Sequence, residues 1–164
     1  LVPDVRLIVL LRDPVERALS QLFHSRRLGL EPLEPESALA AEPERMAAAE
    51  EVVLAGGRHR SHQEHSYVSR SRYELQLARY EALFPAKQLL LLRSEDLFRS
   101  ASEVWKRLLH FLELEPLPMP SLPRANAGRK EADALPSRLR EHLRQQLSVT
   151  YAVMANRYGM EWKE

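Results

Sequence analysis

Arg12 and Ser20 have the types and spacing expected of an anion-binding site. Arg12 follows the apolar run Leu7–Leu11, and Asp13 and Pro14 come directly after it. Asp is a favoured helix N-cap and Pro suits the first helical position, so the sequence predicts a helix that starts where a strand ends. Backbone N–H groups and the helix dipole both favour negative charge at such a junction. The Ser20 hydroxyl lies eight residues further on and could reach the same anion.

The spacing alone leaves two interpretations of this junction open. It is compatible with a phosphate site, and it is also compatible with a strand-end Arg followed by an ordinary capped helix, an arrangement that many α/β proteins have. Glu16, three residues after Asp13, fits the capping interpretation because a carboxylate at that position completes a capping box.

The elements expected around this junction form an α/β pattern. The unbroken apolar run at 7–11 is typical of a strand buried on both faces of a parallel sheet, and a second run at 88–93 predicts a second strand. Most of the sequence between the two strands, and most of the sequence after the second, has helical character. The predicted helices cover 14–28, a segment from about 37, a segment ending at Pro85, a segment capped by Ser100 with Glu103, and 137–158, with a possible break at Pro43.

Three blocks resemble the PAPS-dependent sulfotransferase family (PAPS is 3′-phosphoadenosine-5′-phosphosulfate). The first is the junction itself, RLIVLLRDPVERALSQLFHSRR, which is similar to the family's 3′-phosphate-binding motif. The second is YVSRSRYELQLARYEALFPAKQLLLLRSEDL, with its helix, Phe-Pro break, strand and Glu-Asp-Leu. The third is VWKRLLHFLEL, in which Glu113 stands where Gly is usual.

The resemblance implies a P-loop-like, three-layer α/β fold with a parallel sheet flanked by helices. The family's first strand and its Gly/Ser/Thr-rich loop for the 5′-phosphosulfate, which carries a Lys, are missing from the sequence. The chain is therefore expected to be a partial sulfotransferase domain over residues 1–164. Its expected parts are the 3′-phosphate-binding strand and helix at 6–28, a helical insertion at 31–84, the second strand at 88–93, and a C-terminal loop and helix at 116–164.

The resemblance also assigns donor-binding residues. The family's Arg and Ser that hold the 3′-phosphate map onto Arg12 and Ser20. A family loop that closes over the same phosphate maps onto Gly128 and Arg129, and Lys130 is the natural substitute for a cation that the family has nearby. A glycine there lets the backbone approach the phosphate oxygens.

A stretch rich in Arg and His, 58–72, leads into the second block. His59, His62 and His65 recur at every third position, but no carboxylate or thiolate stands at a matching offset, so a metal site is not expected. We expect instead a loop bounded by Gly57 that lies over the active site or is simply solvated. His65 is a possible catalytic base, and a surface or capping role is the alternative.

The composition narrows the class of protein. The chain has 164 residues, 45% of them hydrophobic, a net charge of +1 and no cysteine. The charge disfavours a nucleic-acid partner, and the lack of cysteine fits a reducing compartment, so we expect a cytoplasmic protein. No apolar run approaches the length of a membrane span.

The implied reaction is transfer of a sulfuryl group from PAPS to a hydroxyl or amine acceptor, a small molecule or a carbohydrate among them, leaving adenosine 3′,5′-bisphosphate. The catalytic Lys and base are expected outside this chain, Glu95 is expected to be structural, and no metal is required. The chain alone is expected to be inactive and aggregation-prone, since the sheet would lack a neighbouring strand. Two alternatives remain: another P-loop nucleotide enzyme such as a kinase using ATP and Mg²⁺, and a non-catalytic remnant that acts as a binding module.

Overall fold

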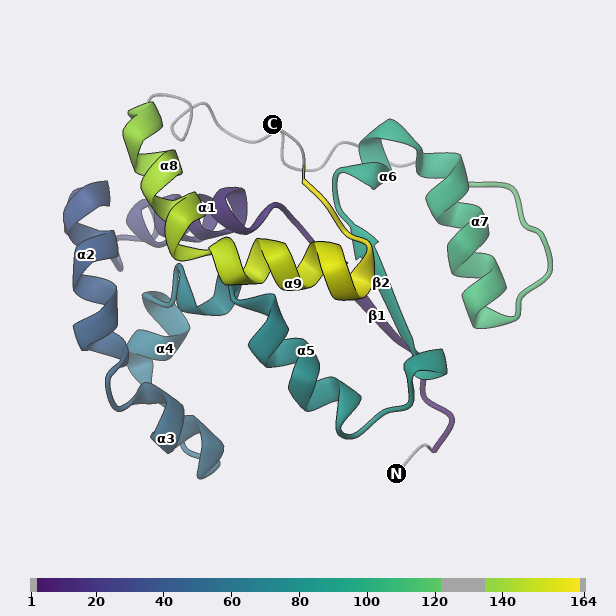
Figure 1. The fold of residues 1–164 in the computed structure, drawn as a ribbon, viewed down its shortest axis with the longest axis horizontal. Helices are drawn as coiled ribbons and strands as arrows, with labels where there is room; N and C mark the ends of the chain where they lie inside the picture. The colour runs from purple at the N-terminus through teal and green to yellow at the C-terminus, as the bar shows by residue number, and fades with distance from the viewer. Residues whose placement is uncertain (1–2, 122–134, 163–164) are drawn as a thin grey trace. The chain divides into compact units, whose positions relative to one another are not determined.

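The computed structural model describes residues 3–121 and 135–162, which form two compact units (Figure 1). The first unit contains the described residues of Leu1–Asp13 and Leu75–Gly128. The second contains those of Pro14–Glu74 and Arg129–Glu164. The chain passes from the first unit to the second between Asp13 and Pro14, within the junction that the sequence singles out.

The first unit is a small parallel sheet with helices beside it. Strands β1 (Leu7–Leu11) and β2 (Leu89–Arg93) pair in parallel, with Leu7 opposite Leu89 and Leu11 opposite Arg93. The 3-10 turn η2 (Ala86–Gln88) precedes β2, and α6 (Asp96–Arg99) and α7 (Ala101–Leu112) follow it and contact it. The helix α5 (Tyr73–Glu81) lies mostly in this unit. The predicted α/β class with a parallel sheet is confirmed.

The prediction that the first strand is buried on both faces is wrong for β1. Ile8 and Leu10 are 45% and 51% exposed, whereas Leu11 is buried. Side chains alternate between the two faces of a strand, so Ile8 and Leu10 share one face, and that face is open. β1 also pairs with a single strand among the described residues.

The second unit is helical. Its elements are α1 (Pro14–Arg27), α2 (Pro35–Met46), α3 (Ala49–Leu54), α4 (Arg60–Glu64), η1 (Ser69–Ser71), α8 (Ser137–Gln146) and α9 (Ser148–Tyr158). α1 is central: its apolar side contributes to two groups of buried side chains, one shared with Val68 and α8, the other with Ala38 and Tyr67. Gly29 follows α1 with φ +70°, the left-handed conformation that suits glycine after a helix end.

The stretch predicted as a loop, 58–72, contains two short helical elements. These are α4 and η1, and His59 Nδ1 accepts a hydrogen bond from the backbone N–H of His62 at the start of α4. The prediction that this whole stretch is a loop is therefore wrong. Elements of five and three residues are too short for an apolar period to appear in the sequence.

Three helix predictions differ in detail from the structure. The helix predicted over 137–158 is two helices, α8 and α9, that meet at Leu147, a fully buried residue. α2 runs through Pro43 rather than breaking there, with Ala38 and Glu42 buried on its packed side and Pro43 exposed. Ser100 does stand at the N-cap of α7, but its side chain makes no capping hydrogen bond.

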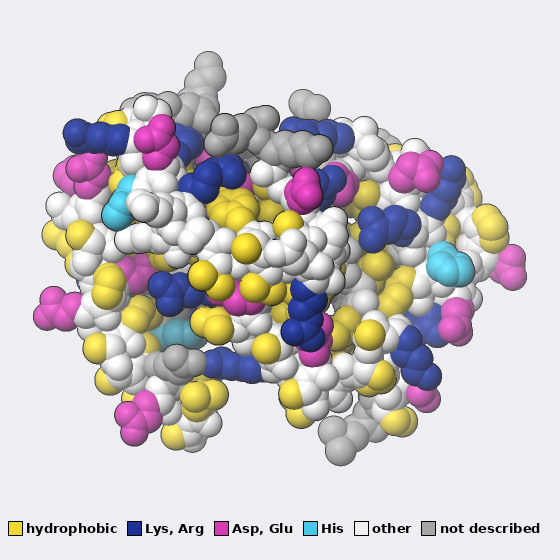
Figure 2. Space-filling view, viewed as in Figure 1, with side chains coloured by type: hydrophobic (Ala, Val, Ile, Leu, Met, Phe, Trp, Pro, Cys, Tyr) yellow, Lys and Arg dark blue, Asp and Glu magenta, His cyan; other side chains and the backbone are white. Residues whose placement is uncertain are grey.

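Within the described parts of the chain, no helix has the length and apolar character needed to cross a membrane. On the face shown in Figure 2, acidic and basic side chains are interspersed, without a broad area of one sign. That distribution agrees with the net charge of +1.

Candidate anion-binding junction

Arg12 lies at the carboxyl end of the sheet, on a turn held by backbone and carboxylate hydrogen bonds. The N–H of Ser94 donates to the carbonyl of Leu11 at 2.7 Å, which extends the strand pairing by one step. The N–H of Asp13 donates to Glu95 Oε1 at 2.9 Å. The Arg12 side chain, between these two anchored positions, is exposed.

The acidic residues beside Arg12 hold the turn that carries it. Arg93 and Asp96 form a two-pronged ion pair, with Nε–Oδ2 and Nη2–Oδ1 distances of 2.9 and 2.7 Å. Glu95 accepts a hydrogen bond from the Asp13 backbone, a contact that fits the structural role expected of Glu95. The carboxyl ends of parallel strands are where α/β proteins place their ligands, and Arg12 is accessible there.

Ser20 lies in the second turn of α1, on its exposed side. Ala18, Leu19 and Leu22 are fully buried, whereas Ser20 is exposed. Burial of three near neighbours fixes which way the helix faces, so the packing of α1 determines that the Ser20 hydroxyl is accessible.

Arg17, one turn before Ser20, has a structural role that the sequence did not predict. Its Nη1 donates to the carbonyls of Ser66 and Tyr67 at 3.2 and 3.0 Å. Burial lowers the pKa of the Arg17 guanidinium from its ordinary value. Arg17 therefore connects α1 to the segment after α4.

A buried cluster of polar side chains supports the same segment. Tyr67, fully buried, donates its hydroxyl to Glu31 Oε2 at 2.7 Å, and Arg45 pairs with Glu31. Burial would raise the pKa of Glu31, but hydrogen bonds from Arg45, Tyr67 and the Leu33 N–H together lower it. Burial, with the hydrogen bond to Glu31, raises the pKa of the Tyr67 hydroxyl well above its ordinary value.

Glu42 anchors the end of this segment from α2. Its two carboxylate oxygens accept the backbone N–H groups of Val68 and Ser69, at 2.7 and 2.8 Å, and the residue is buried. A carboxylate that accepts two N–H groups is a strong local tie. No sequence signal marks Glu42, because its partners stand 26 and 27 residues away.

His65 is held within the second unit. Its Nε2 lies 3.1 Å from the carbonyl of Leu30, and its Nδ1 is buried without a hydrogen-bond partner in the described structure. The His65 ring is half-buried, so the expected surface role is wrong, and its role as a catalytic base stays a prediction. No group of three or more His, Asp or Glu side chains among residues 3–121 and 135–162 is arranged to hold a metal ion.

The predicted donor-binding residues are distributed over different parts of the chain. Arg12 belongs to the first unit and Ser20 to the second, and each is accessible within its own unit. The remaining three, Gly128, Arg129 and Lys130, lie outside the described residues.

The chain belongs to the sulfotransferase family. The family model described as "Sulfotransferase domain" matches residues 1–124, a range that includes Arg12 and Ser20 and ends before Gly128. The fold agrees: a crystal structure of a sulfotransferase from Alicyclobacillus acidocaldarius is similar at 23% sequence identity with a TM-score of 0.69. That similarity covers 98% of this chain and 57% of the other, so this chain spans little more than half the length of that protein. No curated protein matches the chain.

Proposed function

We propose that this chain is the donor-binding part of a PAPS-dependent sulfotransferase. The observation that carries the proposal is the accessible Arg12 guanidinium at the carboxyl end of β1, on a turn held by Glu95, in a chain of the sulfotransferase family. The proposed setting is the cytoplasm, which the absence of cysteine supports.

In this proposal Arg12 and Ser20 hold the 3′-phosphate of the donor. The guanidinium offers a planar fork of N–H donors that matches phosphate oxygens, and the hydroxyl adds a further donor. Both side chains are exposed, which contact with a ligand requires, so the residues present fit such a group. Gly128, Arg129 and Lys130 complete the proposed phosphate contacts.

PAPS supplies the sulfuryl group for the reaction. The acceptor oxygen or nitrogen forms a bond to sulfur, the bond from sulfur to the 5′-phosphate oxygen breaks, and adenosine 3′,5′-bisphosphate leaves. The acceptor proton passes to a base, for which this chain offers no assigned residue. The part of this chain is to bind and orient the nucleotide, which lowers the barrier by positioning. The acceptor class is a hydroxyl or amine on a small molecule or carbohydrate.

Nucleotide preference tests this proposal against the two alternatives. Equilibrium binding is measured for adenosine 3′,5′-bisphosphate and for ATP, each with and without Mg²⁺. A sulfotransferase prefers the bisphosphate and needs no Mg²⁺. Preference for ATP with Mg²⁺ would identify a kinase-like enzyme. No binding of either nucleotide by a longer version that contains the family's 5′-phosphosulfate loop would identify a non-catalytic module.

The loop residues are tested by a double substitution, Arg129→Ala with Lys130→Ala. The change should weaken binding of the bisphosphate much more than binding of 5′-AMP, because only the bisphosphate offers a 3′-phosphate to these cations. Equal loss for both nucleotides, or no loss, would remove the loop from the proposed site and leave Arg12 and Ser20 as the contacts.

A further inference from the structure

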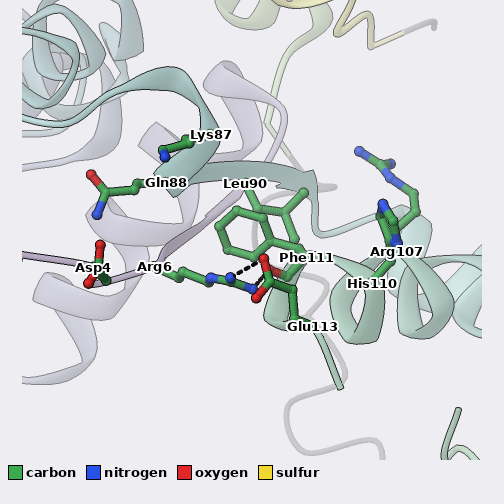
Figure 3. Close-up of a pocket in the computed structure, with 9 residues that line it drawn as sticks. All are labelled: Asp4, Arg6, Lys87, Gln88, Leu90, Arg107, His110, Phe111 and Glu113. Carbon is green, nitrogen blue, oxygen red and sulfur yellow. Dashed lines mark hydrogen bonds and ion pairs between the residues drawn. The ribbon is translucent and has the colours of Figure 1, made fainter. Parts of the chain in front are cut away.

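A pocket lies at the amino end of the sheet, the opposite end from Arg12 (Figure 3). Its volume is about 730 Å³, within the range of small-molecule sites. Residues before β1, residues before β2 and the last turns of α7 line it, all within the first unit. Nothing in the proposed sulfuryl transfer uses this end of the sheet.

The pocket has an apolar floor with basic side chains on two sides. Leu90 and Phe111 form the floor, with Lys87 on one side and Arg107 with His110 on the other, as Figure 3 shows. Arg107 and His110 stand three residues apart on α7 and therefore project from neighbouring turns. None of these three basic side chains makes an ion pair with a residue in the described ranges.

The charges of the lining favour a negatively charged occupant. Lys87, Arg107 and Arg6 carry three permanent positive charges, against two carboxylates, Asp4 and Glu113. The Glu113 carboxylate is already paired with Arg6, which also donates to the carbonyl of Phe111 at the end of α7. Lys87 and Arg107, on the two sides of the floor, are therefore available to bind an anionic ligand.

Glu113 is the C-cap of α7 and has the left-handed conformation in which many helices end. It is the single non-glycine residue with positive φ in the described chain, at φ 56°, where relatives in the family resemblance usually have Gly. The left-handed conformation is unfavourable for a residue with a Cβ. Its ion pair with Arg6 contributes little to the stability of the fold, because the Glu113 side chain is 79% exposed. A Gly at this C-cap would adopt the same conformation without that cost.

We propose that this pocket binds an organic dianion, an apolar body with a carboxylate or sulfonate at each end. The apolar body lies on Leu90 and Phe111, one anionic group meets Lys87, and the other meets Arg107 and His110. Glu113 competes with the ligand by holding Arg6, so its carboxylate opposes binding.

Equilibrium dialysis tests the proposal with two aromatic probes of one scaffold, naphthalene-2,6-disulfonate and naphthalene-2-sulfonate. The disulfonate should bind at least fivefold more tightly than the monosulfonate. Lys87→Gln and Arg107→Gln should each reduce its affinity to that of the monosulfonate, and Glu113→Gly should tighten it severalfold by freeing Arg6. Dialysis gives the affinity whatever the oligomeric state of the chain.

Two matched controls locate the effect. Lys106→Gln removes a neighbouring cation of α7 that pairs with Glu103 and does not line the pocket, so it should leave the affinity unchanged. Arg12→Ala should also leave it unchanged, which separates this site from the proposed donor site. Equal affinity for the two probes, no saturable binding, or insensitivity to both Lys87→Gln and Arg107→Gln would overturn the proposal. If the Glu113→Gly variant bound the disulfonate more weakly, Glu113 would not compete with the ligand for Arg6.

Discussion

The two units present their proposed phosphate contacts by different physical means. In the first unit, Arg12 is positioned by a turn at the open end of a two-stranded sheet, through the hydrogen bond from the Asp13 N–H to Glu95. In the second, Ser20 is positioned by a helix whose neighbouring residues are fully buried. One contact depends on a few hydrogen bonds of a half-exposed turn and the other on a packed core, so substitutions should affect them differently.

The largest effect is expected in the core beneath Ser20. Leu22→Ala should lower the free energy of unfolding by about 2–5 kcal/mol, since the side chain is fully buried and its removal leaves a cavity. Ile8→Ala in β1 is the matched apolar control and should cost well under half as much, because Ile8 is 45% exposed. Denaturant unfolding of both variants gives the comparison. Similar losses would show that the two units are held equally by burial.

The second effect concerns the carboxylate that anchors the segment after α4. Glu42→Gln should destabilise the protein by about 1–3 kcal/mol, because an amide has one acceptor oxygen and leaves the N–H of Val68 or Ser69 unpaired. Glu44→Gln on the same helix removes the same charge at an exposed position and serves as the control. Faster amide exchange at residues 68 and 69 in the Glu42 variant alone would establish the local cause, and unchanged exchange there would contradict it.

A smaller effect is expected at the turn that carries Arg12. Glu95→Ala should cost about 1 kcal/mol of stability, since the hydrogen bond that it removes is partly solvated. Its effect on bisphosphate affinity should be the larger of its two effects, because Arg12 loses its anchored neighbour. Glu103→Ala, which breaks an exposed ion pair with Lys106, is the control for charge alone. Loss of stability without loss of affinity would mean that Arg12 does not depend on this turn.

The smallest expected effect is a pH dependence of stability in the second unit. The pKa of Glu31 is lowered by folding, so its contribution is present above the ordinary value of 4.5 and is lost as pH falls through the folded value. The pKa of Tyr67 is raised, so its contribution is lost as pH rises above the ordinary value of 10.0. Thermal unfolding across pH measures both losses. Glu31→Gln should remove the acidic one, and an unchanged acidic loss in that variant would assign it to other carboxylates.

The elements of the junction could be predicted from sequence because their signals are local. The apolar run of β1, the Asp-Pro start of α1 and Gly29 after it each depend on neighbouring residues, and the structure has all three. The degree of burial of β1 could not be predicted, because it depends on what covers Ile8 and Leu10 rather than on the strand itself.

The supporting residues of the site could not be predicted for a related reason. Glu42, Arg17 and Tyr67 act through partners that stand tens of residues away in sequence. The same holds for α2, which continues through Pro43 because the packing of Ala38 and Glu42 outweighs one lost backbone hydrogen bond. Tertiary contacts determine these features. Such contacts cannot be predicted from one sequence, because they join residues that the local pattern does not relate.

The central claim is that Arg12 binds the 3′-phosphate of the donor nucleotide. Isothermal titration of a longer version that contains the family's 5′-phosphosulfate loop, with adenosine 3′,5′-bisphosphate and with 5′-AMP, measures that contact directly. The two ligands differ by that phosphate alone. The bisphosphate should bind at least tenfold more tightly, and Arg12→Ala should weaken its binding by about 1.5–3 kcal/mol while leaving 5′-AMP nearly unaffected. Equal affinity of the unsubstituted protein for the two nucleotides would contradict the assignment of Arg12 and, with it, the proposed donor site.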